Sequence, residues 1–237
     1  MEARPDGDAR YAIYLAPAPE TDLWRRASGW LGRDAATDAA VAWQGPAGLD
    51  PRRAAEITAD ARHYGFHATL KAPFRLRAGT TAADLCAAAR AFAGRQQGFP
   101  LRLRLSAVGS FLALVEAEPV DAVARLHAAV LQEFEPFRAA PRAAEVARRL
   151  QAGLSARQKE SLAEWGYPYV LDDFRLHYTL TSALPPAERR TVEAALASFF
   201  AADIAAPVMI DAICVFAQPA ATAPFHILYR APFAPSR

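Results

Sequence analysis

Cysteine is scarce in this chain of 237 residues, which contains only Cys86 and Cys214. Neither has the C-x-x-C or Cys/His spacing that zinc sites and redox centres use, so both are expected to be reduced thiols. The sequence does not decide whether a single disulfide joins them. The sequence therefore predicts neither a disulfide framework nor a cysteine-based metal site.

Long apolar runs are also missing. No run reaches the roughly 18 apolar residues of a membrane-spanning helix, so the sequence predicts no membrane association. The first ten residues, MEARPDGDAR, are polar and lack the apolar core of a secretory leader. These features together favour a cytoplasmic protein.

An excess of charge of one sign is absent as well. The 27 basic residues, of which two are lysines, nearly balance 25 acidic residues, and the formal net charge is +2. Proteins that follow a nucleic-acid backbone need a basic stripe or patch. A long nucleic acid is therefore not expected as a partner, and the oligomeric state is left open.

Three widespread catalytic signatures do not occur in the chain. They are the G-x-S-x-G turn of serine hydrolases, the G-x-x-x-x-G-K-[ST] loop of nucleoside triphosphatases and the G-x-G-x-x-G turn of dinucleotide-binding folds. Those three enzyme classes therefore lack support.

A short motif is present twice, as HATL at 67–70 and HYTL at 177–180. Each copy precedes an expected helix (80–95 and 185–200) and then two expected strands (99–108 with 111–118, and 206–219 with 224–233). The segment 120–166 between the units is expected to be helical. We predict one domain over 1–237, with two pseudo-repeated lobes at about 64–118 and 174–233.

The two motifs are expected to lie on strands, where side chains alternate between the two faces of a sheet. Each strand would then have an apolar face for the core and a polar face carrying an imidazole and a hydroxyl. The polar faces would hold His67, Thr69 and Lys71 in the first strand, and Arg175, His177, Thr179 and Thr181 in the second.

This set of side chains suits a phosphodiester. Threonine hydroxyls can donate to phosphate oxygens without adding charge. An imidazole titrates near neutral pH, so one histidine can accept the proton of an attacking water while the other protonates the leaving oxygen. No metal is required, because these groups can carry both proton transfers and stabilise the developing charge.

Paired H-x-T-apolar motifs resemble the signature of the two-histidine (2H) phosphoesterases, which include LigT-like RNA ligases and cyclic phosphodiesterases. More narrowly, the chain is similar to the DUF1045-like branch found with phosphonate-utilisation genes, over essentially its whole length. The segments that carry the resemblance are WLGRD (30–34), YGFHATLKAPF (64–74), WGYPYV (165–170) and FRLHYTLT (174–181).

The resemblance implies an α+β, two-lobed, pseudo-symmetric LigT-like fold, with antiparallel sheets facing a central groove and helices outside. It implies that His67 and His177 are catalytic, that Thr69 and Thr179 bind the phosphate, and that no metal or cofactor takes part. The implied substrate is a cyclic phosphate ester of a small sugar or nucleotide, such as a phosphorylated ribose 1,2-cyclic phosphate from phosphonate degradation.

Several further residues have open roles. Lys71, Arg175 and Thr181 are candidates for substrate binding, and the alternative for each is an ordinary strand residue. Tyr11, Tyr14 and His226 could line the groove, although core packing is the default. His63 precedes His67 by four residues, but Gly65 disfavours a helix there, and a strand would separate the imidazoles by about 13 Å, too far for one metal ion.

Two other functions remain open from the sequence. One is processing of RNA ends that carry a 2′,3′-cyclic phosphate, or 2′-5′ ligation. The other is a non-catalytic protein that binds a phosphorylated ligand, which the presence of both histidines disfavours. Which histidine is the base and which the acid is also left open.

Overall fold

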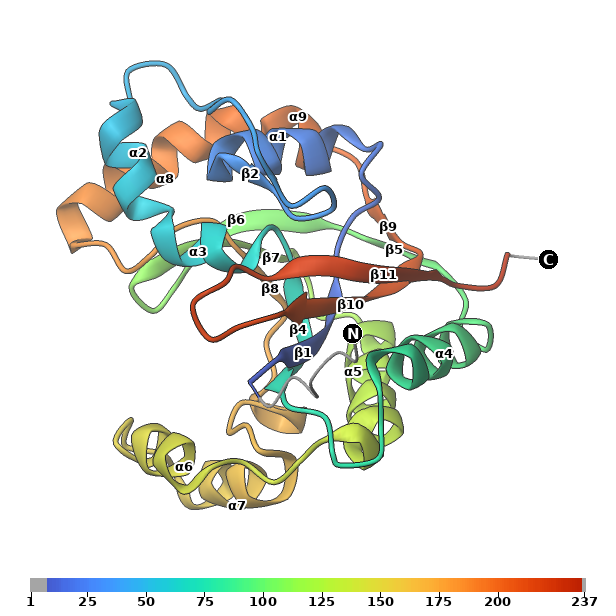
Figure 1. The fold of residues 1–237 in the computed structure, drawn as a ribbon. Helices are drawn as coiled ribbons and strands as arrows, with labels where there is room; N and C mark the ends of the chain where they lie inside the picture. Colours follow the sequence, from blue (N-terminus) through green and yellow to red (C-terminus); the bar gives the residue numbers. More distant parts are fainter. Residues whose placement is uncertain (1–7, 236–237) are drawn as a thin grey trace, which may run out of the picture.

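A computed structural model describes residues 8–235 of the chain. It is a mixed α+β fold built on one seven-stranded sheet (Figure 1). The outer positions 1–7 and 236–237, which belong to the predicted domain, lie outside the described residues. The strands of the sheet are β1 (Arg10–Leu15), β4 (Ala68–Phe74), β6 (Leu103–Val108), β7 (Phe111–Glu116), β8 (His177–Thr179), β10 (Ala212–Gln218) and β11 (His226–Pro232).

The order of strands in the sheet is β11-β10-β1-β4-β8-β7-β6, and neighbouring strands pair antiparallel. Two short ribbons are separate from it: β2 (Arg33–Asp34) pairs with β3 (Ala39–Ala40), and β5 (Phe99–Leu101) pairs with β9 (Val208–Ile210). The α+β class and the antiparallel pairing agree with the sequence analysis. The strands of the two units share one sheet, however, whereas two facing sheets were expected.

The helices lie around this sheet, and several begin with capping residues. Thr81 and Asp84 form a capping box, and so do Ser155 and Gln158, because each pair satisfies backbone N–H groups that a helix start leaves unpaired. The helices are α1 (Asp22–Leu31), α2 (Pro51–Ile57), α3 (Ala59–Tyr64), α4 (Ala82–Ala93), α5 (Asp121–Phe134), α6 (Ala143–Leu150), α7 (Ala156–Trp165), α8 (Pro186–Phe199) and α9 (Ala201–Ile204), with 3₁₀ turns η1 (Glu135–Phe137) and η2 (Leu171–Asp173).

The two sequence units have the expected order of elements, but their hairpins are exchanged. The hairpin β6–β7 of the first unit pairs with β8, which carries the second motif. The hairpin β10–β11 of the second unit pairs with β1, which in turn pairs with β4 and the first motif. The second motif strand, β8, is therefore flanked on both sides by strands of the first half, whereas β4 lies between β1 of its own half and β8.

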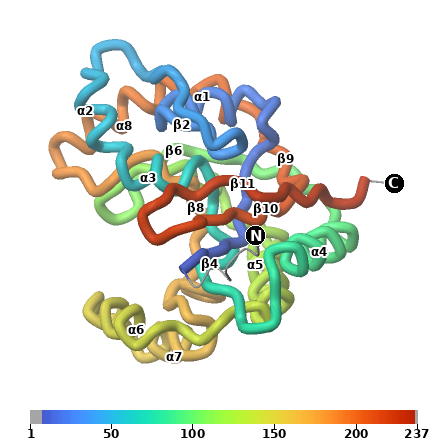
Figure 2. Tube along the Cα trace, in the orientation of Figure 1, coloured from blue at the N-terminus to red at the C-terminus, as the bar shows by residue number. Residues whose placement is uncertain are grey.

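The predicted apolar faces of both motif strands are buried in the core. Helix α5 packs on β4, and α4 packs on β10 and β11 (Figure 2). Burial of large apolar side chains is the main favourable contribution to folding, so the core holds the motif strands in place. The buried residues next to the motifs are Phe66, Ala68, Leu70, Leu176, Tyr178 and Leu180.

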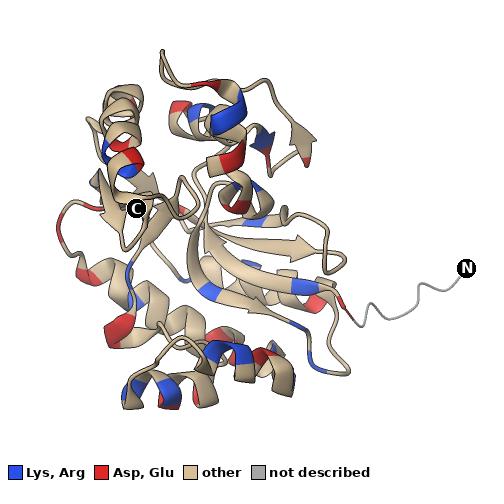
Figure 3. Ribbon diagram, turned by 90° about the vertical axis from the view of Figure 1, so that its left-hand side faces the viewer, with Lys and Arg blue, Asp and Glu red and all other residues tan. Residues whose placement is uncertain are grey.

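Charges of both signs are interspersed along the chain. Figure 3 shows basic and acidic positions alternating on the helices, without one extended basic element. No helix within residues 8–235 is long and apolar enough to cross a membrane.

Candidate functional site

The strands β4 and β8 meet at the middle residue of each motif, where Ala68 pairs with Tyr178. In an antiparallel register, this pair sets the histidine of each motif across from the threonine of the other. Side chains directly opposite are about 5 Å apart and diagonal ones about 7–8 Å. The register therefore gathers four polar groups on one face of the sheet, with the histidines on a diagonal. The four groups are His67, Thr69, His177 and Thr179.

The two imidazoles are held in the same way. Nδ1 of His67 lies 2.9 Å from the carbonyl oxygen of Gly65, and Nδ1 of His177 lies 2.7 Å from that of Arg175. A carbonyl oxygen only accepts, so each Nδ1 carries the proton and donates. Nε2 is then the free nitrogen of each ring, and Thr69 Oγ1 lies 3.3 Å from Nε2 of His67.

The ring of Tyr14 stacks on His67, with centroids 3.9 Å apart and planes 21° from parallel. Burial lowers the pKa of His67 to about 4, and the nearby His177 acts in the same direction, against the bond to the Gly65 carbonyl. The closest described ring to His177 is Phe111, tilted at a centroid distance of 5.7 Å. His67 is thus neutral at pH 7, and the lone pair on its Nε2 faces the hydroxyl of Thr69, 3.3 Å away.

A cavity of about 410 Å³ opens beside these motifs, within the usual range of about 300–1,000 Å³ for small-molecule sites. His67, Thr69 and Thr179 are among its lining residues, whereas His177, on the same strand as Thr179, is not. The remaining walls come from α3, from α6 and from the segment after α7. Those walls contribute Asp60, Ala61, Tyr64, Arg148, Arg149 and Tyr167, while Arg10, Tyr14, Ala72 and Pro73 come from β1 and β4.

Most of those wall residues were missed by the sequence analysis. Arg10 lies four positions before Tyr14 on β1 and so shares its face. Arg148, Arg149 and Tyr167 belong to the connection between the units, and nothing in their local sequence predicts which way that connection folds.

A second cavity is larger, at about 730 Å³, but it contains none of the four motif groups. It lies between β6, β7, α5 and the η2 segment, and Arg175 is part of its lining. We take the smaller cavity as the candidate site because it is the one that the two motifs line.

Lys71 does not lie on the histidine face, which corrects the prediction from strand alternation. A bulge in β4 shifts the pairing from Tyr14–Thr69 to Ile13–Lys71, and one extra residue reverses the side to which a strand residue points. Lys71 is 2% exposed, and its Nζ donates to Glu135 Oε2 at 2.6 Å. Burial lowers the pKa of Lys71, and the pair with Glu135 opposes that effect.

Thr181 and Arg175 are also not in the cavity. Thr181 is fully buried, and its hydroxyl accepts a hydrogen bond from the backbone N–H of Leu112 at 3.0 Å. Arg175 is exposed and donates to the carbonyl oxygens of Asp172 and Phe174. Neither side chain therefore lines the cavity that the motifs form.

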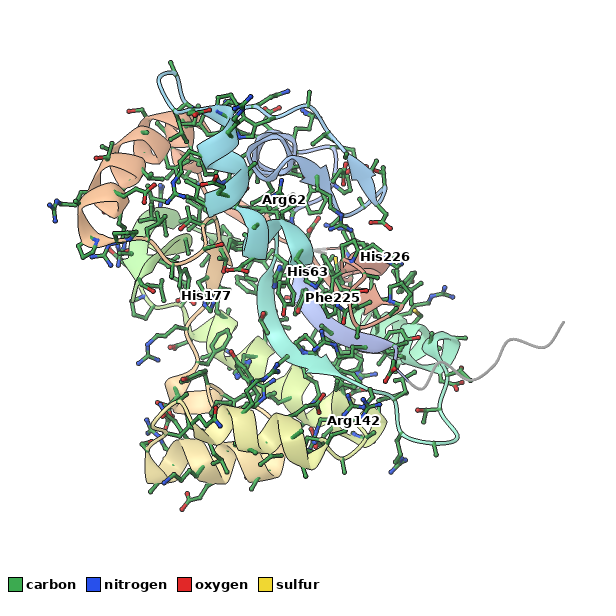
Figure 4. All side chains as sticks on the ribbon, turned by 60° about the vertical axis from the view of Figure 1, so that its left-hand side comes forward. Arg62, His63, Arg142, His177, Phe225 and His226 are labelled. Atoms are coloured by element: carbon green, nitrogen blue, oxygen red, sulfur yellow. The ribbon has the colours of Figure 1, made fainter. Side chains whose placement is uncertain are left out.

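The other histidines take structural positions. His63 lies on α3, which ends at Tyr64 before Gly65, so no helix carries both His63 and His67; its Nε2 accepts from Gln218 Nε2 at 3.1 Å. His127 links two segments, because Nδ1 donates to the Leu70 carbonyl and Nε2 accepts from Leu171 N–H. His226 lies on the far strand β11, on the other side of β4 from His177 (Figure 4).

The described residues include no group of three or more His, Cys, Asp or Glu side chains that could hold a metal ion. Cys86 and Cys214 are free thiols, and burial raises the pKa of Cys214 to about 12. Of the tyrosines that might line the groove, Tyr14 does so and Tyr11 is not among the lining residues.

Two curated proteins are similar to nearly the whole chain. "Ribose 1,5-bisphosphate phosphokinase PhnN" of Janthinobacterium sp. (strain Marseille) is 39% identical over 229 residues, which cover 94% of this chain and 51% of that protein. The protein of the same name in Laribacter hongkongensis (strain HLHK9) is 38% identical over 218 residues, covering 92% and 50%. The chain thus spans about half the length of the curated relatives it matches.

A solved structure described as "Crystal structure of phosphoesterase" aligns with 96% of this chain and 99% of its own, at a TM-score of 0.41 and 13% identity. A likeness this weak bears on neither fold nor activity. The model of the family described as "Protein of unknown function (DUF1045)" matches residues 69–226, from the threonine of the first motif to the start of β11. That match covers well over half of the chain, which therefore belongs to the DUF1045 family.

Proposed function

We propose that the chain is a phosphodiesterase that opens a cyclic phosphate ester on a small phosphorylated sugar, with His67 and His177 as its acid–base pair. The observation that carries the proposal is the pairing of Ala68 with Tyr178, which sets two imidazoles and two hydroxyls around one point on the sheet. A phosphorus atom at that point is within reach of all four groups. This is the arrangement expected of a two-lobed, two-histidine phosphoesterase.

The roles of the two histidines follow from their surroundings. His67 is neutral at pH 7 because burial lowers its pKa to about 4, so its Nε2 takes the proton of the attacking water. The water oxygen forms a bond to phosphorus as the bond from phosphorus to the leaving oxygen breaks. In this proposal His177 reacts in its doubly protonated form: Nδ1–H stays on the Arg175 carbonyl, Nε2–H gives its proton to that oxygen, and exchange with solvent restores both rings.

The hydroxyls of Thr69 and Thr179 would hold the non-bridging phosphate oxygens. They are neutral donors fixed on paired strands, and such preorganised donors stabilise charge that develops in a transition state. In this mechanism no step passes through a metal ion or an organic cofactor. Turnover that persists in EDTA would agree with it, and restoration by Zn²⁺ or Mn²⁺ after EDTA treatment would contradict it.

The substrate class is supported by the name of the two relatives, ribose 1,5-bisphosphate phosphokinase. This chain lacks the G-x-x-x-x-G-K-[ST] loop, so we assign that phosphotransfer to the half of the relatives outside the match. Opening a 1,2-cyclic phosphate of ribose 5-phosphate at O2 yields ribose 1,5-bisphosphate. The two halves would then catalyse successive steps.

A panel of cyclic phosphates followed by phosphorus NMR tests this proposal. The panel contains ribose 1,2-cyclic phosphate with and without a 5-phosphate, and nucleoside 2′,3′-cyclic phosphates. We expect the sugar esters to be opened, with the product identifying the bond that breaks. Turnover of the nucleoside esters alone would indicate RNA-end processing, and no turnover of any ester would refute the phosphodiesterase.

A further inference from the structure

Three arginines line the end of the cavity that is remote from the threonine motifs. They are Arg10 at the start of β1 and Arg148 and Arg149 in the last turn of α6. We propose that they form a second anion site, which binds a phosphomonoester carried by the same molecule whose cyclic ester lies at His67. This inference rests on the proposed function, because it assumes that a phosphodiester occupies the motif end.

The distance between the two ends suits a phosphorylated sugar. Arg10 and Tyr14 share the groove face of β1, and four residues of strand span about 13 Å. Tyr14 stacks on His67, so this is also the separation along the sheet between Arg10 and the catalytic end. The long arginine side chains shorten the gap, so a five-carbon sugar can bridge the two anions.

The nearby carboxylates are paired with other arginines. Glu145 on α6 accepts two hydrogen bonds from Arg75, at 2.8 and 2.7 Å, and Asp8 pairs with Arg142. Within residues 8–235, none of the three cavity arginines forms an ion pair with a carboxylate. Their charge is therefore available to a ligand.

The net charge of the lining also favours a dianion. Asp60 on α3 contributes a carboxylate to the lining, against three guanidinium groups. The remaining excess of two positive charges matches a phosphomonoester, which carries about −1.5 to −2 at pH 7. A neutral sugar ring needs no such excess.

Two of the guanidinium groups are oriented by contacts that leave donor atoms free. Arg10 Nε donates to Gln218 Oε1 at 2.6 Å, and its guanidinium lies 5.5 Å from the centre of the Phe225 ring. Arg149 lies over the ring of Tyr167 at 4.9 Å. Stacking occupies only the face of a guanidinium. The N–H donors along its edge remain available, and their geometry matches two oxygens of a phosphate.

The test compares ribose 1,2-cyclic phosphate with and without the 5-phosphate, using the wild-type chain and the variant Arg148→Ala/Arg149→Ala. We expect kcat/KM to favour the phosphorylated ester in the wild type, by roughly 100-fold, since charge-assisted bonds are the strong ones. In the variant that preference should fall by about 10-fold or more. Arg190→Ala, on the exposed surface of α8, is the matched control and should leave it unchanged.

Arg10→Lys is a second, milder variant that keeps the charge but loses the two-pronged geometry. It should lower the preference less than the double variant does. A wild type without preference, or variants that slow both esters by the same factor, would overturn the second anion site while leaving the phosphodiesterase intact.

Binding measured by calorimetry separates this inference from the proposed function. Ribose 5-phosphate should bind more tightly than ribose to the wild type, and the difference should be lost in Arg148→Ala/Arg149→Ala. If the wild type opens neither ester, the proposed function fails. The binding of ribose 5-phosphate relative to ribose then shows by itself whether the second anion site exists. Equal binding of ribose 5-phosphate to both proteins would refute it.

Discussion

The two motif strands carry the same letters in different surroundings. In both, an imidazole donates from Nδ1 to the carbonyl oxygen two residues earlier, so the free nitrogen is the same. The first motif lies on the seven-residue strand β4, under the ring of Tyr14, whereas the second lies on the three-residue strand β8 beside Phe111. The same backbone hydrogen bond thus orients both imidazoles, whereas the aromatic neighbours of the two rings differ.

This difference teaches that a repeated motif need not have a repeated role. Burial disfavours the charged form of an imidazole, which suits a base that must be neutral before the reaction. The ring beside His177 is that of Phe111, which is tilted and lies farther away, at 5.7 Å. The repeated sequence predicts that the histidines and threonines of the two motifs lie together. The packing around each histidine then makes the two imidazoles different.

Loss of either histidine should give the largest effect. His67→Ala and His177→Ala are each expected to lower kcat by about 10²- to 10⁴-fold, because each removes one proton transfer. The double variant should be little worse than the poorer single one, since the pair acts as a unit. Steady-state kinetics measures both, with His226→Ala as the control. Binding of ribose 5-phosphate should be largely retained, and a loss below tenfold in kcat would contradict the acid–base pair.

The threonines should give the next largest effect. Thr69→Val and Thr179→Val remove one phosphate donor each, and we expect kcat/KM to fall by about 10²-fold. Thr181→Val is the matched control two residues along, because its hydroxyl bonds to the backbone of Leu112 instead. That change should lower the free energy of unfolding by about 1–3 kcal/mol without changing kcat. Equal kinetic effects at 179 and 181 would refute the assignment.

The pH dependence should report which histidine is the base. With a pKa of about 4 for His67, kcat/KM should stay level down to about pH 5 and then fall tenfold per pH unit below pH 4. An acid limb well above pH 5 would instead contradict His67 as the base.

The same shift predicts the sign of a stability change. Because the pKa of His67 is lower in the folded chain than in the unfolded one, the unfolded chain binds the proton first as the pH falls. The contribution is fully present above about pH 6.5 and is lost between about pH 6.5 and 4. His127, whose pKa burial also lowers to about 4, adds to this loss. Chemical denaturation at several pH values measures it.

Lys71 should give the smallest effect on catalysis. Lys71→Met removes the pair with Glu135, but Arg138 still donates to that carboxylate at 2.8 Å. We expect a loss of about 1–3 kcal/mol in the free energy of unfolding, with kcat/KM within a factor of about two. A large kinetic loss with an unchanged melting temperature would return Lys71 to the site and contradict the bulge.

Much of the fold and the centre of the site could be predicted from the sequence. Alternation correctly buried Phe66, Leu70 and Tyr178, and it set each motif histidine and threonine on one face. The helix caps at Thr81 and Ser155 also follow from the local sequence, because few residue types can accept hydrogen bonds from the unpaired backbone N–H groups of a helix start.

What could not be predicted depends on long-range packing. The bulge that turns Lys71 toward Glu135 forms against β1, and no local signal marks it. The exchange of hairpins is a choice of partners between segments far apart in sequence, and so is the approach of Arg148 and Arg149 to the cavity. Periodicity fixes which face a side chain takes, but not which element lies opposite.

The exchange of hairpins also has a consequence for cooperativity. Neither half of the chain holds a complete sheet, since β8 pairs on both sides with strands of the first half and β10 pairs with β1. Local opening of one half would remove the support of both imidazoles at the same moment. Activity should therefore disappear in a single step as the protein is denatured, and a chain cut between residues 118 and 174 should regain it only when both fragments reassemble.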